Sequence, residues 1–207
     1  MGISEMSMNP ENALRNLIDV TNILSKHDVI HWIQNGTLLG LYREGTFIDY
    51  DTDIDFGLSA ETFTVNCYKE LLDYGFQLKF IFGRVEDSLE IALSRFNIGV
   101  DLFFHYITDD IQYHCIFDDW SPGEYRRYDY RYKQFNVKRK VYLDTELFVP
   151  EDELLHLKTN YGENWAKPTK SWNIATSPSN VHRTDIVLNA RECTRMFDQY
   201  LKSCYYG

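Results

Sequence analysis

The stretch that decides the fold is Asp49-Tyr-Asp51-Thr-Asp53-Ile-Asp55-Phe-Gly57. Carboxylates recur at every second position, and the residues between them are aromatic, β-branched or apolar. Residues two apart in an extended chain point to the same side, so the run predicts a half-buried strand with Asp51, Asp53 and Asp55 on one face. Such a row of like charges is unfavourable without a cation. The pattern therefore predicts a divalent-metal site for Mg2+ or Mn2+.

Three other interpretations compete with a catalytic metal strand. A solvated acidic surface is the commonest origin of such runs, but it does not explain the register with apolar residues. An EF-hand loop would need Gly where Phe56 stands and a bidentate Glu where Thr62 stands. A glycosyltransferase D-x-D motif also binds a metal and a nucleotide diphosphate. Only the segment that precedes the aspartates distinguishes this interpretation from a catalytic metal strand.

That preceding segment, residues 29–45, has the pattern of an apolar strand, a Gly-Thr turn and a short helix ending near Gly45. Gly36 permits close approach of a ligand to the backbone, and Thr37 can cap the helix and offer its hydroxyl. The N–H groups at a helix start attract phosphate oxygens. One Gly-Thr pair is usually an ordinary turn. Followed closely by the acidic strand, it predicts that the turn binds phosphate and the strand binds metal.

Residues 28–58 resemble the LicD and fukutin group of the nucleotidyltransferase-fold, or polymerase-β-like, superfamily. The resemblance rests on Gly36-Thr-Leu-Leu-Gly40, Arg43, Gly45, Phe47-Ile48 and the acidic strand, and on a later Tyr161-Gly-x-x-Trp165 element followed by Pro168. The chain departs from the group at two points. Asn35-Gly36-Thr37 stands where Gly-Gly is common, and Tyr50 stands where Trp is common. Both changes keep the small turn and the aromatic bulk.

The resemblance implies an α+β fold, with a nucleotidyltransferase-like mixed or antiparallel sheet flanked by helices and a helical C-terminal part. It also implies a metal-dependent transferase that moves phosphocholine, ribitol phosphate or a similar phospho-alditol from a CDP-linked donor to a glycan acceptor. Two alternatives stay open. One is a nucleotidyltransferase that moves a nucleoside monophosphate from a triphosphate to a small hydroxylated acceptor. The other, a non-catalytic nucleotide-binding domain, is disfavoured because the expected carboxylates are present.

Superfamily members use a third carboxylate on a later strand, and the apolar run around Asp101 offers one. A lone buried carboxylate is costly unless it is paired or bound to a metal, although a salt bridge to an Arg would also satisfy it. We expect Asp53, Asp55 and Asp101 to be the metal ligands and the catalytic residues. If a general base is required, Asp101 or another carboxylate is expected to serve, and His105 is a weaker choice.

The residues expected to bind the donor are Gly36, Thr37, Arg43, Asp51 and Arg95. Guanidinium groups pair bidentately with phosphate, and Arg43 ranks first because the resemblance places it near the turn. Arg84 is a further candidate. Arg95 follows the alternating residues Leu89, Ile91 and Leu93, which would put it on their face unless the strand is bulged.

Length and composition agree with one domain over residues 1–207, with a core at about 10–145 and a helical segment at about 150–204. The chain has 207 residues, 44% of them hydrophobic, and a net charge of −10 with scattered basic residues, which argues against a nucleic-acid partner. The four cysteines have no metal spacing and are expected to be reduced thiols. No signal peptide or integral membrane segment is evident, so we expect a cytoplasmic protein.

The remaining pattern predicts further elements. We expect a helix from Asn9-Pro10 through Leu24, a second helix from Ser59 to about Tyr74, and strands near 76–82, 88–95 and 98–106. Residues 120–136 are expected to form an ordered loop, a candidate lid or acceptor platform. Pro150 is expected to open a helix ending near Gly162, and a final helix is expected over about 180–203. Residues 167–172 are expected to be a surface segment near the active cleft.

Overall fold

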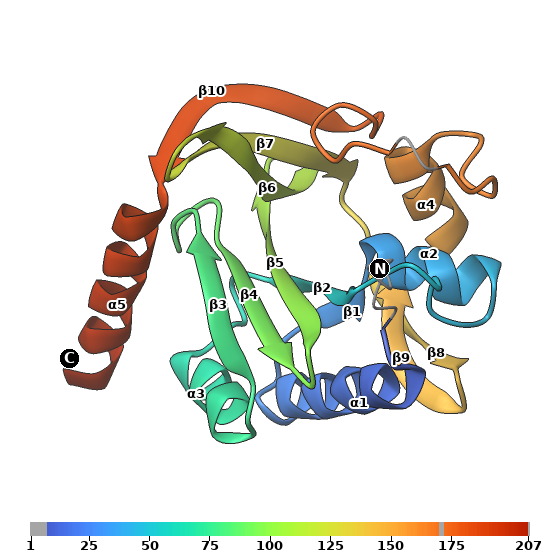
Figure 1. Ribbon diagram of the computed structural model, residues 1–207, viewed down its shortest axis with the longest axis horizontal. Coiled ribbons are helices and arrows are strands. Elements are labelled where there is room, and N and C mark those ends of the chain that lie inside the picture. Colours follow the sequence, from blue (N-terminus) through green and yellow to red (C-terminus); the bar gives the residue numbers. More distant parts are fainter. Residues whose placement is uncertain (1–7, 170–171, 207) are drawn as a thin grey trace, which may run out of the picture.

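The computed structural model describes residues 8–169 and 172–206, which form a mixed α+β fold (Figure 1). The elements in chain order are α1 (Pro10–Lys26), β1 (His31–Ile33), α2 (Asn35–Arg43), β2 (Asp53–Ser59), α3 (Val65–Asp73), β3 (Gln77–Phe82), β4 (Glu90–Arg95), β5 (Ile98–Thr108), β6 (Ile111–Ser121), β7 (Glu124–Lys133), β8 (Val137–Tyr142), β9 (Thr145–Pro150), α4 (Glu153–Tyr161), β10 (Val181–Asn189) and α5 (Ala190–Tyr206). The predicted fold class is confirmed.

The main sheet has the strand order β1-β2-β5-β6-β7-β10, with β4 also paired to β5 and β3 paired to β4. Only the β2–β5 pairing is parallel among the described strands, and its register sets Asp55 opposite Asp101. Strand β5 joins the two halves of the sheet, because residues 98–105 pair with β2 and β4 while Tyr106–Thr108 pairs with β6. The site carboxylates therefore lie where the sheet branches.

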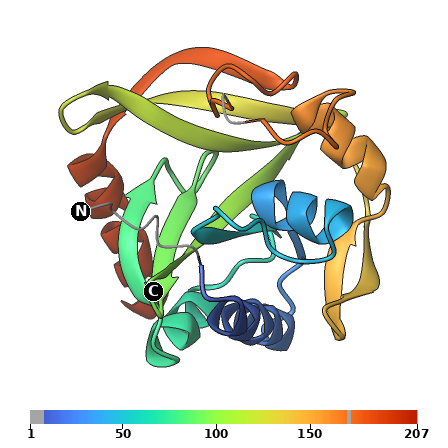
Figure 2. The ribbon, with the colours of Figure 1, turned by 45° about the vertical axis from the view of Figure 1, so that its right-hand side comes forward.

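Helices α1 and α3 lie together below the sheet in the view of Figure 1, and α5 runs beside β3 at the opposite end from α2 and α4. Figure 2 shows the β6, β7 and β10 strands arching over this lower half. The β8–β9 hairpin packs against β1. One cluster of buried apolar side chains extends from α1 through the sheet to α5, and Ile54 and Phe56 of β2 lie fully within it.

Helix α1 begins as predicted, since the Asn9 side chain accepts a hydrogen bond from the Asn12 N–H at 3.0 Å and Pro10 follows the cap. The second predicted helix starts later than expected. Ser59 is the last residue of β2, and α3 begins only after Thr64, whose Oγ1 accepts the Cys67 N–H at 3.2 Å. The strands expected near 76–82, 88–95 and 98–106 are confirmed as β3, β4 and β5.

The prediction of a loop at residues 120–136 is wrong, because most of this segment belongs to the β6–β7 hairpin. Tyr130 and Tyr132 are buried while Arg131 and Lys133 are exposed, which is the period of a strand. The alternation is obscured earlier in β7, where Arg127 and the charged residues around it are also buried. Ion pairs make the burial of these charged residues possible. Because the residues are charged, the sequence of the strand has the composition of a polar loop.

The prediction of a final helix over about 180–203 is also corrected. Residues 181–189 form β10, which pairs with β7, and the final helix begins only at Ala190. The β-branched Val181, Thr184, Ile186 and Val187 favour a strand. Pro150 ends β9 and does not open a helix, since α4 starts at Glu153 behind an Asp152 cap.

Two further sequence expectations concern the cysteines and the membrane. All four cysteines are free thiols, with Cys204 exposed and the other three buried. Among the described residues, no helix is long and apolar enough to cross a membrane.

Candidate active site

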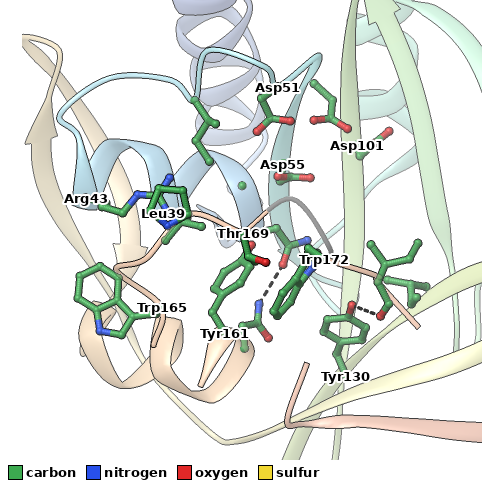
Figure 3. Close-up of a pocket in the computed structure, with 18 of the residues that line it drawn as sticks. Leu39, Arg43, Asp51, Asp55, Asp101, Tyr130, Tyr161, Trp165, Thr169 and Trp172 are labelled. Carbon is green, nitrogen blue, oxygen red and sulfur yellow. Dashed lines mark hydrogen bonds between the residues drawn. The ribbon is translucent and has the colours of Figure 1, made fainter. Parts of the chain in front are cut away.

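A cavity of about 740 Å³ opens between α2, the centre of the sheet and the segment that follows α4. Figure 3 shows the aspartates along one wall, with Tyr161, Trp172 and Tyr130 facing them from the other side. The expected surface segment after α4 contributes Lys167, Pro168, Thr169 and Trp172 to the lining. Residues 170 and 171 of that segment lie outside the described part of the chain.

Three carboxylates converge at this cavity. One oxygen from each of Asp53, Asp55 and Asp101 lies within 4.8 Å of the others. Asp53 and Asp55 alternate along β2, and the parallel register sets Asp101 beside Asp55 on the same face. Ile54 points into the core on the other face. The arrangement is the strand pattern expected from the sequence, with the third carboxylate supplied by β5.

Asp51 reaches the site by a different route from the one predicted. It precedes β2, in a turn where its N–H donates to the Ile48 carbonyl at 2.9 Å, yet its side chain borders the cavity. Gly36 makes room for it. A Cβ atom at position 36 would lie 2.6 Å from Oδ2 of Asp51. A side chain at position 36 would therefore force the Asp51 carboxylate to move.

Thr37 lies in the first turn of α2 and is not its cap. Gln34 holds the N-cap position, and its side chain makes no capping hydrogen bond. Both the hydroxyl and the N–H of Thr37 form hydrogen bonds with Asp55. Thr37 is therefore not the cap that the sequence predicted, and its hydrogen bonds hold a site carboxylate in place. Its role in binding phosphate stays a prediction.

The carboxylates crowd negative charge into a poorly solvated space. Burial, followed by the charge of Asp53, raises the pKa of Asp101 to about 7. Burial and a hydrogen bond with Asp53 raise the pKa of Asp51 to about 8, and burial raises the pKa of Asp55 well above its usual range. A divalent cation would relieve this repulsion, and three oxygen donors suit a hard ion such as Mg2+ or Mn2+.

Two cationic side chains line the cavity. Arg43 lies at the end of α2, where its Nη2 is 2.5 Å from Oε1 of Glu44. Lys167, for which the sequence suggested no role, lies on the segment after α4. Both can approach an anionic group held near the aspartates.

Arg95 is not brought to this site. Its guanidinium pairs with Asp19 of α1 and lies 4.6 Å from the ring centroid of Phe76. The β4–β5 register continues without a bulge, so alternation sends Arg95 to the core side of the sheet. Arg84 is also elsewhere, paired with Asp87 at 2.7 Å.

His105, the weaker candidate base, is a buried structural residue. Its Nε2 lies 2.8 Å from Oε1 of Gln34, and its ring packs against Trp32 at 4.6 Å between centroids. Burial lowers the pKa of His105 well below its usual value. The ring does not border the cavity.

Sequence reasoning missed Asn160 and Glu90, which both line the cavity. The Asn160 side chain donates to Oδ1 of Asn35 at 3.2 Å and accepts the Tyr132 hydroxyl at 2.8 Å, so it connects the start of α2 to the upper half of the sheet. Its position directly before Tyr161 was the available signal. For Glu90 the signal was alternation, since Leu89 and Ile91 occupy the core face.

Comparison with known proteins agrees with this geometry. Residues 28–152 match the family described as "LicD/FKTN/FKRP, nucleotidyltransferase domain". The chain belongs to this family. It is 31% identical over 168 residues to the human "Ribitol-5-phosphate transferase FKTN", which is 79% of this chain and 35% of that protein. The mouse FKTN protein is 31% identical over 160 residues, covering 75% of this chain and 33% of that protein.

A protein of Rickettsia typhi named "Uncharacterized protein RT0683" is 26% identical over 164 residues, covering 79% of this chain and 48% of that protein. The chain thus spans about a third of the FKTN proteins and about half of the Rickettsia protein. In this LicD/FKTN/FKRP chain, the family match includes all the site carboxylates. The lining residues at the end of α4 and after it in the chain, among them Tyr161, Lys167 and Trp172, follow the matched range.

Proposed function

We propose that this chain is a metal-dependent transferase that moves a phospho-linked group from a CDP-activated donor to a hydroxyl of a glycan. The observation that carries the proposal is the convergence of Asp53, Asp55 and Asp101 in a cavity large enough for a nucleotide-linked substrate. The names of the FKTN relatives favour ribitol phosphate as the transferred group over phosphocholine.

We assign Asp53, Asp55 and Asp101 as ligands for Mg2+ or Mn2+. When bound, the cation would draw charge from the donor phosphates and orient them for in-line displacement. Thr37 keeps the Asp55 carboxylate turned toward the other two ligands. Asp51 lies beside this set and adds negative charge without belonging to the close triad.

Arg43 and Lys167 are suited to the diphosphate of the donor, because they are the positive side chains among the described residues that line the cavity. Neutralising the departing nucleoside monophosphate would favour bond breaking. Tyr161 and Trp172, with ring centroids 4.7 Å apart, form an aromatic wall against which a base or sugar can pack. Gly36 lines the same space at the start of α2.

The direct test is turnover. The chain would be incubated with CDP-ribitol, CDP-glycerol or CDP-choline, Mg2+ or Mn2+, and a glycan acceptor, and release of CMP would be measured. We expect CMP release that requires both metal and acceptor and is lost in Asp53→Asn. Asp110→Asn, a change at an exposed turn residue, is the matched control.

The competing nucleotidyltransferase reaction is tested in parallel with CTP and ATP. It would release pyrophosphate and transfer the nucleoside monophosphate to a small hydroxylated acceptor. Pyrophosphate release without turnover of any CDP-linked donor would overturn the proposed function in favour of nucleotide transfer.

A further inference from the structure

Glu90 is a further carboxylate in the cavity: it lines the same space as Asp53, Asp55 and Asp101 but is not one of these three assigned metal ligands. It is the first residue of β4, which pairs with β3 and β5, and its side chain lines the cavity. Oε2 of Glu90 is shielded from solvent and has no hydrogen-bond partner among the described residues. Leaving such an atom unpaired in a protein interior is costly, so its placement calls for a partner that arrives with the substrate.

Two buried carboxylates elsewhere in this chain have a purely structural role, because the protein itself supplies their partners. Glu153 is 4% exposed and is bound by the Lys140 ammonium at 3.0 Å and by the Tyr142 hydroxyl at 2.5 Å. Asp129 is 7% exposed and accepts from Nε of Arg127 at 2.7 Å. Each is neutralised by the protein. Glu90 differs because it faces a cavity already rich in negative charge.

The sheet register fixes where Glu90 lies relative to the triad. In the antiparallel β4–β5 pair, Asp101 is opposite Ala92 and Phe103 is opposite Glu90. Glu90 and Asp101 are therefore diagonal neighbours on one face of the sheet, with their Cα atoms roughly 7–8 Å apart across the two strands. Glu90 is not a member of the set whose oxygens lie within 4.8 Å of one another. It is adjacent to the metal triad and separate from it.

Apolar and aromatic side chains line the cavity together with Glu90. Phe103, Ile116, Phe117 and Tyr130 line the same cavity, and Phe103 stands directly opposite Glu90 in the register. Burial raises the pKa of Glu90 well above its usual range, and the charge of Asp101 adds to this effect. A carboxyl group in apolar surroundings is a stronger base than one in water.

We propose that Glu90 is the catalytic base for the acceptor hydroxyl, an assignment that rests on the proposed transferase function. The acceptor O–H bond breaks and its proton passes to the Glu90 carboxylate, while the acceptor oxygen forms a bond to the phosphorus of the transferred group. The bond between that phosphorus and the bridging oxygen of the diphosphate breaks, and its electron pair leaves with CMP. Glu90 touches the acceptor, and the triad binds the donor side.

The test compares Glu90→Gln, Glu90→Ala and the exposed control Glu61→Gln with the wild-type chain. We expect kcat of Glu90→Gln to fall about 100-fold or more, with KM for the donor and the calorimetric Kd for Mn2+ unchanged. Formate, a small carboxylate that can enter the space left in Glu90→Ala, should restore part of its kcat. Formate should not stimulate the wild-type chain.

Three results would overturn the assignment in distinguishable ways. Wild-type kcat in Glu90→Gln would remove Glu90 from catalysis and leave the proposed function intact. A large loss of Mn2+ affinity in Glu90→Gln would place Glu90 among the metal ligands. A wild-type chain that turns over no CDP-linked donor would overturn both the base assignment and the proposed function.

Discussion

Thr37 and Asp55 are joined by two hydrogen bonds that run in opposite directions. The N–H of Thr37 donates to Oδ2 of Asp55 at 3.3 Å, and the N–H of Asp55 donates to Oγ1 of Thr37 at 2.9 Å. This pair fastens the first turn of α2 to the acidic strand β2 and sets the direction of a site carboxylate.

Thr37→Val removes the hydroxyl while keeping the branched shape of the side chain. The buried Asp55 N–H loses its acceptor, so we expect the free energy of unfolding to fall by about 1–3 kcal/mol. Metal affinity should weaken roughly 10–100-fold, the range seen when the support of a metal ligand is removed. Urea unfolding and calorimetric Mn2+ titration measure the two effects. Thr37→Ser, which keeps the hydroxyl, is the control, and equal behaviour of Val and Ser would contradict the account.

Gly36→Ala should lower kcat/KM, because the added Cβ would lie 2.6 Å from Oδ2 of Asp51 and would displace that carboxylate. The cause is separable by a double-mutant cycle with Asp51→Ala. If the clash with Asp51 is responsible, the double variant should have the same kcat/KM as Asp51→Ala alone. Strictly additive losses would mean that Gly36 acts through something other than this contact.

The metal-free protein should be stabilised by removing a site carboxylate. The pKa of Asp101 is raised to about 7 in the folded state, so its contribution to stability is lost as pH rises from its unfolded value near 3.8 toward 7. In EDTA at pH 7.5, Asp101→Asn should therefore have a higher Tm than the wild-type chain. Adding Mn2+ should raise Tm for wild type and have little effect on the variant. A lower Tm for Asp101→Asn in EDTA would rule out charge repulsion at this site.

Acid should destabilise the chain through buried histidines as well. Burial lowers the pKa of His114 and of His156 to about 3. The unfolded chain binds protons at these groups near pH 6.5, so their contribution to stability is complete above that value and declines as pH falls from 6.5 toward 3. The His156 ring stacks on Tyr132, and a charge on it would lower the pKa of both His105 and His114.

His156→Phe keeps an aromatic ring against Tyr132 and removes one titrating group. We expect the decrease in the free energy of unfolding between pH 7 and pH 5 to be smaller in this variant than in the wild-type chain. Urea denaturation at the two pH values measures it. An unchanged pH dependence would exclude His156 as a source of acid sensitivity.

The acidic strand could be predicted from sequence because its information is local. Alternation along Asp53, Ile54 and Asp55 specifies both the strand and the side that bears the carboxylates, and the cap at Asn9 specifies the start of α1 in the same way. Asp101 was singled out because the family resemblance implies a third carboxylate on a later strand, and because a single acid in an apolar run requires a partner.

The errors arose where long-range pairing outweighed local composition. Residues 181–189 become a strand because β7 offers an edge to pair with, and the alternation in β7 itself is hidden by buried charges such as Arg127. Arg95 forms an ion pair with Asp19 of α1, which is distant from it in the sequence. Glu90 lies near Asp101 because of the β4–β5 register. The pattern of residues within one strand does not define how that strand is aligned with its neighbour.

The central claim is that Asp53, Asp55 and Asp101 hold a divalent cation through which a CDP-linked donor binds. Calorimetric titration of CDP, CMP, UDP and ATP with and without Mn2+, on the wild-type chain and on the Asp53→Ala/Asp55→Ala double variant, tests it most directly. We predict binding that requires the metal, is strongest for CDP and is lost in the double variant. CDP binding that is equally tight without metal, or unchanged in the double variant, would contradict the account.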